Sequence, residues 1–412
     1  MFNFLTLKSV AETLALLELF EPLPATEVPL AEALGRVLAE PFLAPENLPG
    51  FDRSTVDGFA VQARDVFGAS EGLPAALTLV GECPMGQAPT LVIQPGQTAR
   101  IWTGGMLPQG ADAVVMLEHA RLSESQGLVE LTRPLAPGDN VILADEDAIQ
   151  GRELIPPGQT LGPPELGLLA ALGQKSARVR SQPTVAILAS GDEVVPLDVE
   201  PGPGQVRDIN SQTIQALASL AGAKTLSLGL APDDLPTLSA LVHQAWRTAE
   251  IVVISGGSSA GQRDFTLQAL QAIPGAEILA HGVAVSPGKP LIIGRAGQKS
   301  LWGLPGHPAG ALVTAEIFLK PLIWRLTGAR EPVWAQSLTA RLSRPVVSAQ
   351  GRRDYFRVSL SRPDPQGPLL ATPILGKSGL ITTLVGAEAL AICPEELEGL
   401  EAGALVEIRL LS

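Results

Sequence analysis

Residues 250–266, EIVVISGGSSAGQRDFT, decide the fold of this chain. The apolar run at the start of this stretch, 251–254, consists of β-branched residues, which is typical of a fully buried strand in a parallel sheet. The strand is followed by a turn of glycine, serine and alanine at 255–261, in which no side chain is larger than a hydroxymethyl group. A helix is predicted from residue 265 to about residue 272, so the stretch predicts a strand–turn–helix unit.

The turn of this unit is a candidate anion site. Backbone N–H groups at a strand-to-helix turn can surround a negative charge, and Gly256, Gly257 and Ser258 let another molecule approach them closely. Asp264 follows at the start of the helix, where its carboxylate either caps the helix or holds a metal ion that bridges to the anion. An ordinary tight turn capped by Asp264 is the simpler alternative.

Strands and helices alternate on both sides of this unit. The pattern predicts strands over 184–188, 226–228, 251–254, 283–285, 291–293 and 301–304. Asn210 and Ser211 are predicted to cap one of the intervening helices, and Asp233 and Asp234 the next. Such alternation predicts a doubly wound α/β domain, which binds ligands at the carboxyl ends of its strands. The turns at 190–193, 255–264 and 305–308 should therefore open on one edge of the sheet.

The rest of the chain has the patterns of short strands and a few helices. Runs at 77–80, 91–93, 113–117 and 128–131, and again at 337–342, 355–360, 389–392 and 405–411, alternate with Pro/Gly turns. Helices are predicted over 9–19, where Ser9 and Glu12 have the spacing of a capping box, and over 30–38 and 163–173. The chain thus combines an α/β domain with β-rich segments.

Composition excludes several classes of protein. At 412 residues the chain is long enough for two to four domains. No run of about 18 uncharged apolar residues occurs, and the net charge of −13 makes nucleic acids and anionic membranes poor partners. The two cysteines, Cys83 and Cys393, form no metal cluster, and a cytoplasmic location with reduced thiols fits best.

Two further stretches carry candidate ligand groups. Residues 51–61, FDRSTVDGFAV, hold two carboxylates and two hydroxyls on a loop, which is either a hard-cation or phosphate site or a turn capped by its own Asp side chains. Thr103 precedes two glycines and either presents its hydroxyl beside exposed N–H groups or simply ends a strand. Asp145, Glu146 and Asp147 form an acidic cluster of a kind that is usually a solvated loop.

With these stretches in hand, the chain resembles the MoeA-type molybdopterin molybdenumtransferases, and also the C-terminal domain of gephyrin. Eight segments in family order, over nearly the whole chain, carry the resemblance. They are FDRSTVDGFAV, RIWTGG with GADAVVM, the segment from Pro137 to Asp147, ASGDEV, SGGSSAG with its Asp, PGKP, GLPGHP and GKSGLITTL.

The resemblance implies a multidomain fold of α/β plus β type. It places a helical/β segment in 1–48 with 145–180, a β insertion in 49–144, a molybdopterin-binding-type α/β domain in 181–328 and a β-barrel-like domain in 329–412. It also implies a homodimer whose site combines the α/β domain of one subunit with the β insertion of the other. The reaction it implies joins molybdate to adenylylated molybdopterin, releases AMP and uses a divalent cation, usually Mg²⁺, and the molybdopterin adenylyltransferase is a candidate partner.

The resemblance also assigns roles to individual residues. Asp57, Glu193 and Asp264 would handle the metal or molybdate, and Asp57, Thr103, Glu193 and Asp264 are the candidate catalytic set. The candidate substrate-binding residues are Gly256, Gly257, Ser258, Lys289, Pro305, Pro308, Asp147, Asp233, Arg352 and Ser378. Within these, Thr103 and Lys289 with the glycines of the 255–261 turn would hold phosphates or pterin.

The chain departs from the family pattern at several positions that usually carry a cation. Ile142, Leu267, Gly282 and Ser286 stand there instead, and His307 replaces the usual Asn. Each lost contact to a buried anion would cost about 1.5–3 kcal/mol. A non-catalytic carrier of molybdopterin or of the cofactor, or a scaffold for a partner protein, is therefore an alternative to the enzyme. A different nucleotide-linked hydrolase on the same α/β core is a third, and the choice between molybdate and tungstate stays open.

Overall fold

The computed structural model describes residues 7–123, 126–256, 265–330 and 338–411. The chain divides into two compact units. Unit 1 comprises Met1–Glu40, Pro157–Pro163 and Ser176–Ser412, and unit 2 comprises Pro41–Pro156 and Pro164–Lys175. No helix in the described ranges has the length and apolar character needed to cross a bilayer.

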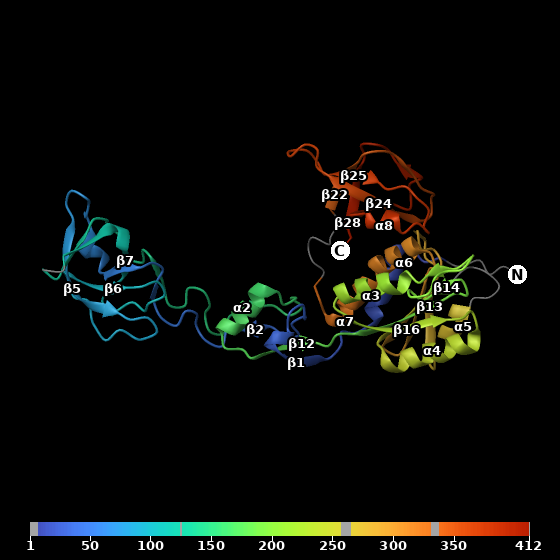
Figure 1. Ribbon diagram of the computed structural model, residues 1–412, viewed down its shortest axis with the longest axis horizontal. Helices are drawn as coiled ribbons and strands as arrows, with labels where there is room; N and C mark the ends of the chain where they lie inside the picture. Colours follow the sequence, from blue (N-terminus) through green and yellow to red (C-terminus); the bar gives the residue numbers. More distant parts are fainter. Residues whose placement is uncertain (1–6, 124–125, 257–264, 331–337, 412) are drawn as a thin grey trace. The chain divides into compact units, whose positions relative to one another are not determined.

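A six-stranded sheet forms the centre of unit 1, in the order β16-β13-β17-β21-β20-β18. Its strands are β13 (Thr184–Ser190), β16 (Lys224–Ala231), β17 (Ile251–Ser255), β18 (Ala276–His281), β20 (Ile292–Ala296) and β21 (Lys299–Leu304). The first four strands of that order are parallel, whereas β20 and β18 pair antiparallel at one side. Helices lie on both faces (Figure 1), so the predicted doubly wound α/β domain is confirmed.

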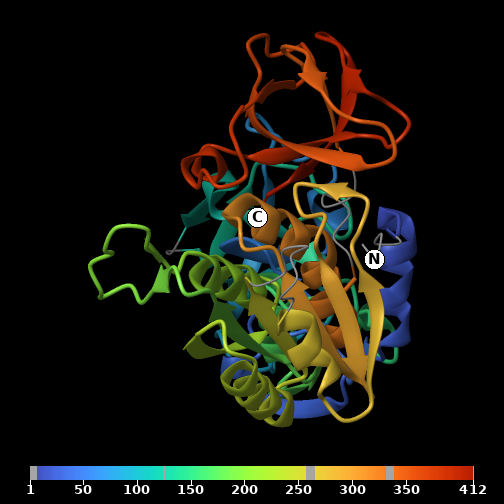
Figure 2. The same ribbon diagram turned by 90° about the vertical axis from the view of Figure 1, so that its right-hand side faces the viewer.

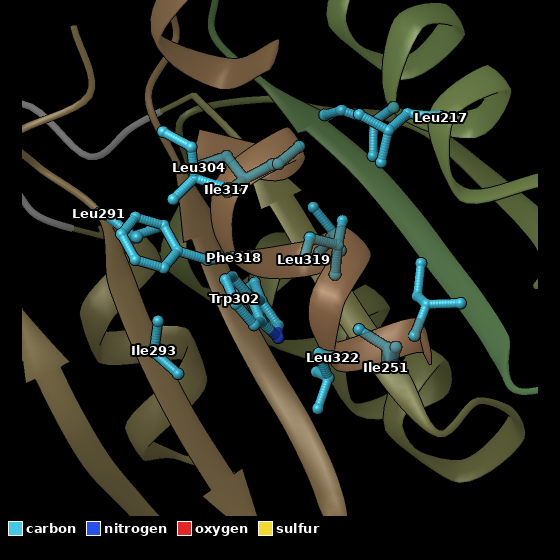
Figure 3. Packing of buried hydrophobic residues seen from close by; sticks show 14 of the residues in the cluster. Leu217, Ile251, Leu291, Ile293, Trp302, Leu304, Ile317, Phe318, Leu319 and Leu322 are labelled. Carbon is cyan, nitrogen blue, oxygen red and sulfur yellow. The ribbon is translucent and has the colours of Figure 1, made fainter. Parts of the chain in front are cut away.

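Alternate residues of each central strand enter two different cores. In β17, Ile251 and Val253 pack into the core with the helices α3, α6 and α7, while Val252 and Ile254 pack into the core with α4 and α5. The helices are α3 (Asn210–Leu220), α4 (Leu235–Thr248), α5 (Phe265–Gln271), α6 (Pro308–Thr314) and α7 (Lys320–Thr327), with a π-helical stretch Ala315–Leu319 between the last two. Figure 3 shows Trp302 and Phe318 at the centre of the first core.

The N-terminal helix belongs to the same core. Helix α1 (Val10–Ala15) continues into a 3-10 turn, Leu16–Leu19, and can be followed in blue in Figure 2. The predicted capping box is present, because Ser9 N–H donates to Glu12 Oε2 (2.7 Å) and Glu12 N–H donates to Ser9 Oγ (3.1 Å). Strands β1 (Ala25–Pro29) and β12 (Ser176–Arg180) then pair antiparallel in unit 1.

The C-terminal strands of unit 1 close into a five-stranded barrel. The closed order is β24-β25-β22-β28-β26 and back to β24. Its strands are β22 (Leu338–Leu342), β24 (Arg353–Ser361), β25 (Leu370–Pro373), β26 (Ala389–Cys393) and β28 (Leu405–Leu410), with β23 (Val346–Val347), β27 (Gly399–Leu400) and the short helix α8 (Thr382–Val385) beside them. Strand β19 (Val285–Ser286) pairs with β24 and so joins the α/β domain to the barrel. The predicted barrel-like domain is confirmed.

Unit 2 is built on a second six-stranded sheet, in the order β7-β4-β6-β5-β9-β8. Its strands are β4 (Gly58–Val61), β5 (Ala75–Cys83), β6 (Gln97–Ile101), β7 (Ala113–Met116), β8 (Ala120–Ser123) and β9 (Leu128–Leu131). Besides the 3-10 turns Ala63–Val66 and Leu117–His119, two short strand pairs and an α-helix lie outside this sheet. They are β2 (Phe42–Leu43) with β11 (Glu153–Ile155), β3 (Arg53–Ser54) with β10 (Val141–Ile142), and α2 (Pro163–Ala171).

Several local predictions were wrong. A helix does not form over 30–38, because only a 3-10 turn Leu30–Glu32 is present and Gly35 then adopts a φ of +73°. Residues 91–93 form one isolated bridge and no strand. The run at 283–285 is not a strand of the α/β sheet, because Val283 bridges to Lys8 and Val285 pairs with Arg353 of β24. Asn210 and Ser211 do not cap α3, since the side chain of Asp208 accepts the Ser211 N–H at 3.0 Å.

Phe318 is the natural place to test the first core, because its side chain is fully buried. We expect Phe318→Ala to lower the free energy of unfolding of unit 1 by about 3–5 kcal/mol, the cost of a large cavity. Leu220→Ala, at a side chain 72% exposed on α3, should change it by less than about 0.5 kcal/mol. Urea unfolding followed by circular dichroism measures both, and equal effects would contradict the packing described.

Candidate active site

The three turns predicted to meet do so at the carboxyl ends of the parallel strands. Strands β13, β17 and β21 pair in register, with Ala189 opposite Ser255 and Ser255 opposite Leu304. The residues that follow line a cavity of about 680 Å³, called cavity A below. Its lining includes Ser190, Glu193, Asn210, Ser255, Gly256, Lys289, Pro305, His307 and Pro308. For the described residues, the prediction that these turns converge is confirmed.

Asn210 ties two of the turns together at the floor of cavity A. Its side-chain amide donates to Ser255 Oγ and to the carbonyl of Gly306, both at 2.8 Å. Asn210 is only 8% exposed, and its Oδ1 is buried with no protein partner among the described residues. Sequence reasoning assigned Asn210 to helix capping only and missed this role, because both partners are distant in sequence.

Gly256 is required by the close approach of the β13 and β17 ends. Its φ is +107°, and a Cβ at this position would lie 2.1 Å from the carbonyl oxygen of Ser190. No other residue fits there without moving one of the strands. Gly257, Ser258 and Asp264, the other predicted residues of this turn, lie outside the described residues.

Asp233 stabilises the turn after β13. Ser190 Oγ donates to Asp233 Oδ1 at 2.8 Å, and the Asp233 N–H donates to Asp192 Oδ1 at 3.1 Å. Of the two aspartates predicted to cap the next helix, Asp234 does so, because its side chain accepts the Thr237 N–H at 3.0 Å. In this structure Asp233 therefore contacts the turn, and it does not line cavity A.

Glu193 carries an exposed carboxylate at the rim of cavity A. None of the hydrogen bonds found among the described residues has this carboxylate as acceptor, so it can serve as an oxygen ligand. Within the described residues no group of three or more His, Cys, Asp or Glu side chains is arranged to hold a metal ion. Of the two other predicted ligands, Asp264 is outside the described residues and Asp57 is in unit 2.

A second cavity, cavity B, has a volume of about 760 Å³ and is lined by the α/β domain and the barrel. Its charged lining residues are Lys289, Arg352, Asp354 and Arg357, and Ser286, Pro305, His307 and Ser378 also line it. Lys289, Pro305 and His307 line cavity A as well. The two cavities therefore adjoin each other around Lys289.

Backbone packing places Lys289. Gly288 has a φ of +123°, and a Cβ there would lie 2.2 Å from Thr314 Cγ2 of α6. The tight approach of this turn to α6 is possible only for glycine. Lys289 itself is exposed, and the Val283 N–H donates to its carbonyl at 2.9 Å.

The cations of the barrel side are held in different ways. Arg352 Nε lies 3.0 Å from the buried Asp354 Oδ1, while Arg357 donates to Thr383 Oγ1 (2.7 Å) and to the carbonyl of Gly376 (2.6 Å). Burial lowers the pKa of the Arg357 guanidinium, which nevertheless stays charged at neutral pH. The sequence analysis singled out Arg352 but not Arg357, because Arg357 is part of none of the sequence motifs.

In unit 2, Asp57 and Thr103 form a hydrogen-bonded pair. Asp57 Oδ1 accepts the Thr103 N–H at 2.7 Å and the Thr103 hydroxyl at 2.8 Å. Strands β4 and β6 bring the pair together, because Gly58 lies opposite Ile101. The N–H donor first, and then the hydroxyl, hold the pKa of the Asp57 carboxyl below its ordinary value. Asp147, also in unit 2, has an exposed side chain.

Family models match most of the chain. A model of the MoeA N-terminal region (domain I and II) matches residues 8–173, a model of a probable molybdopterin binding domain matches 186–325, and a model of the MoeA C-terminal region (domain IV) matches 339–411. A molybdopterin molybdenumtransferase of Bacillus subtilis is 35% identical over 390 residues, which cover 93% of this chain and 89% of that protein. The chain belongs to the MoeA family.

Further relatives of this chain support the same family assignment. A molybdopterin molybdenumtransferase of Nostoc is 35% identical over 371 residues, covering 89% of this chain and 84% of that protein. Two crystal structures of molybdopterin biosynthesis MoeA protein from Pyrococcus horikoshii superpose with TM-scores of 0.80 and 0.84, at 35% and 28% identity. They cover 98% of this chain and 99% and 100% of those chains. The family predicted from the motifs is confirmed, and with it the assignment to the transferase enzymes of molybdenum cofactor biosynthesis.

The Asp57–Thr103 pair gives a pH test. The Thr103→Val variant loses the hydroxyl donor but keeps the N–H donor, so we expect the pKa of Asp57 to rise partway toward its ordinary value. A carboxylate is charged above its pKa, and the variant should therefore lose this charge at a higher pH than the wild type does. NMR titration of the Asp57 side chain measures both values. An unchanged pKa would show that the hydroxyl contributes nothing.

Proposed function

We propose that this MoeA family chain transfers molybdenum from molybdate to adenylylated molybdopterin with release of AMP. The observation that carries the proposal is the sharing of Lys289 by two adjoining cavities. Both substrates are anions, and they must be brought together while their mutual repulsion is reduced. A cation at the junction of two cavities serves that purpose.

Cavity B suits molybdate. Its described lining carries three cationic side chains, Lys289, Arg352 and Arg357, against one carboxylate, Asp354, which is already paired with Arg352. Charge-assisted hydrogen bonds to an oxyanion are about twice as strong as neutral ones. Ser378 adds a hydroxyl to the same lining.

Cavity A suits the pterin and phosphate groups. Its lining combines apolar groups, including Pro305 and Pro308, with polar groups at the strand ends, among them Ser255 and the backbone of Gly256. Such a lining, apolar with a few polar groups, is typical of a site for a small organic ligand such as a pterin.

We further propose that a divalent cation of the Mg²⁺ type is held by carboxylates. Glu193 offers hard oxygen donors that no described residue neutralises, and Asp57 offers one more carboxylate whose low pKa keeps it charged. Such a cation would stabilise charge that develops on phosphate oxygens. We also propose that the protein is a homodimer in which Asp57 of one copy and Glu193 of the other complete one site.

The carrier alternative rests on Ile142, Leu267, Gly282 and Ser286, which stand where the family usually has a cation. Of these four, only Ser286 lines cavity A or B. The remaining three cations of cavity B favour turnover. The two functions differ in one measurable respect, since a carrier binds adenylylated molybdopterin without releasing AMP.

Purified protein is given adenylylated molybdopterin, molybdate and Mg²⁺, and AMP release is followed. We expect turnover, and we expect Glu193→Gln and Asp57→Asn to reduce kcat on the order of 10²-fold or more, as losses of groups that stabilise developing charge do. Glu401→Gln and Glu71→Gln, at exposed carboxylates of units 1 and 2, are the matched controls and should leave kcat unchanged. Tight binding with no AMP would leave the carrier function.

Mixing the two inactive variants tests the homodimer. A mixed dimer of Asp57→Asn and Glu193→Gln contains one site with both carboxylates intact, so AMP release should return in part. No recovery after the subunits have demonstrably exchanged would place both residues in a single copy or outside the site.

Ser286→Lys tests the assignment of cavity B. The added cation should lower the KM for molybdate by about tenfold or more, because a hydrogen bond to a charged group contributes about 1.5–3 kcal/mol. Ser343→Lys, at an exposed serine that lines neither cavity, is the control. An unchanged KM in Ser286→Lys would mean that this position does not face the bound oxyanion.

A further inference from the structure

A third cavity, cavity C, lies elsewhere in unit 1 and shares no lining residue with cavities A and B. Its volume is about 90 Å³, room for several water molecules or one small ion. Three arginines line it, Arg36, Arg180 and Arg330, together with the polar residues Thr160, Gln182 and Thr327. No Asp or Glu is among its lining residues.

The three arginines come from distant segments that the backbone fixes in place. Arg36 follows the turn at Gly35, and its carbonyl accepts the Leu161 N–H at 2.8 Å. Arg180 ends strand β12, and Arg330 follows α7 with its N–H bonded to the carbonyl of Gly158 at 3.0 Å. The cluster is therefore a product of tertiary structure and not of a local basic run.

The guanidinium groups are only partly satisfied by the protein. Arg36 Nη2 donates to the carbonyl of Arg180 at 2.9 Å, and Arg180 Nη1 donates to the carbonyl of Leu23 at 3.1 Å. Arg36 Nε is buried and has no partner among the described residues. No ion pair within 4.0 Å is found for any of the three in that part of the chain, although Glu32 acts on Arg36 over a longer distance.

The ends of two helices at this cavity do not explain the cluster. Arginines near a helix C-terminus often donate to its free carbonyls, and α3 and α7 both end beside cavity C. Here the carbonyl of Gly222 accepts from Gln182 Nε2 at 3.0 Å and that of Leu326 accepts from the Leu23 N–H at 2.7 Å. None of the hydrogen bonds found for the three guanidinium groups goes to α3 or α7.

We propose that cavity C binds a tetrahedral oxyanion with two negative charges, of the size of phosphate, sulfate or molybdate. The planar guanidinium group presents N–H pairs that match two oxygens of such an ion. The ion would offset the repulsion of three like charges that no carboxylate of the lining balances. It would also link the segments that carry Arg36, Arg180 and Arg330, the last of which leads toward the barrel.

The test uses inorganic phosphate and the full chain at constant ionic strength, with chloride as the reference ion. Binding is measured by calorimetry in the Lys289→Met/Arg352→Met background, which removes cations from cavity B and so separates this site from the proposed substrate site. We expect saturable binding there, at least tenfold weaker after Arg36→Gln or Arg330→Gln. Arg362→Gln, an exposed arginine of unit 1 that lines none of the three cavities, is the matched control.

Arg330 is exposed, so its variant reports on binding even if Arg36→Gln fails to fold. Sulfate and molybdate should compete with phosphate for the same site, and a molybdate-soaked crystal should show anomalous scattering at cavity C. AMP in place of phosphate distinguishes an esterified phosphate group from a free ion. A linear, unsaturable response in the Lys289→Met/Arg352→Met background, or an affinity there that neither Arg36→Gln nor Arg330→Gln changes, would overturn the proposal, whatever the outcome of the AMP-release assay.

Discussion

The parallel pairing of β13, β17 and β21 is the constraint on which the site depends. Because the three strands are in register, their ends lie at the same level, and each turn begins where a buried strand stops. The strands have apolar side chains on both faces, so the polar groups of a ligand site can lie only at the strand ends. Asn210 and Gly256 then hold the turns against one another, and cavity A is the space that this arrangement leaves.

The sequence predicted those features that depend on neighbouring residues. A β-branched run such as 251–254 carries its own strand signal, and the Gly-rich turn after it marks a close approach of backbone. Contacts between distant residues gave no such signal. Asn210 is 45 positions from Ser255, and Asp57 is 46 positions from Thr103. Both members of the second pair were singled out, yet only the register of β4 and β6 shows that they meet.

The local charge of the cavities differs in sign from the net charge of the chain. The chain has a net charge of −13, which would repel the anionic substrates of the proposed reaction. At physiological ionic strength, however, charges more than about 8 Å away are largely screened when they are exposed. Cavity B presents Lys289, Arg352 and Arg357 at close range, and cavity C presents three arginines. Total charge therefore predicts poor binding of polyanions such as nucleic acids and says little about small oxyanions in cavities.

Lys289 shows how backbone geometry sets the electrostatics of both cavities. Its position follows from Gly288, which packs against Thr314 too closely for any Cβ, and the hydroxyl of Thr314 is itself tied to the carbonyl of Gly310 at 2.7 Å. The turn therefore packs directly against α6. Anions in cavities A and B would share this one cation, so the charge state of one cavity affects binding in the other. A lysine where the two cavities meet reduces the repulsion between anions bound in them, and so favours their simultaneous occupation.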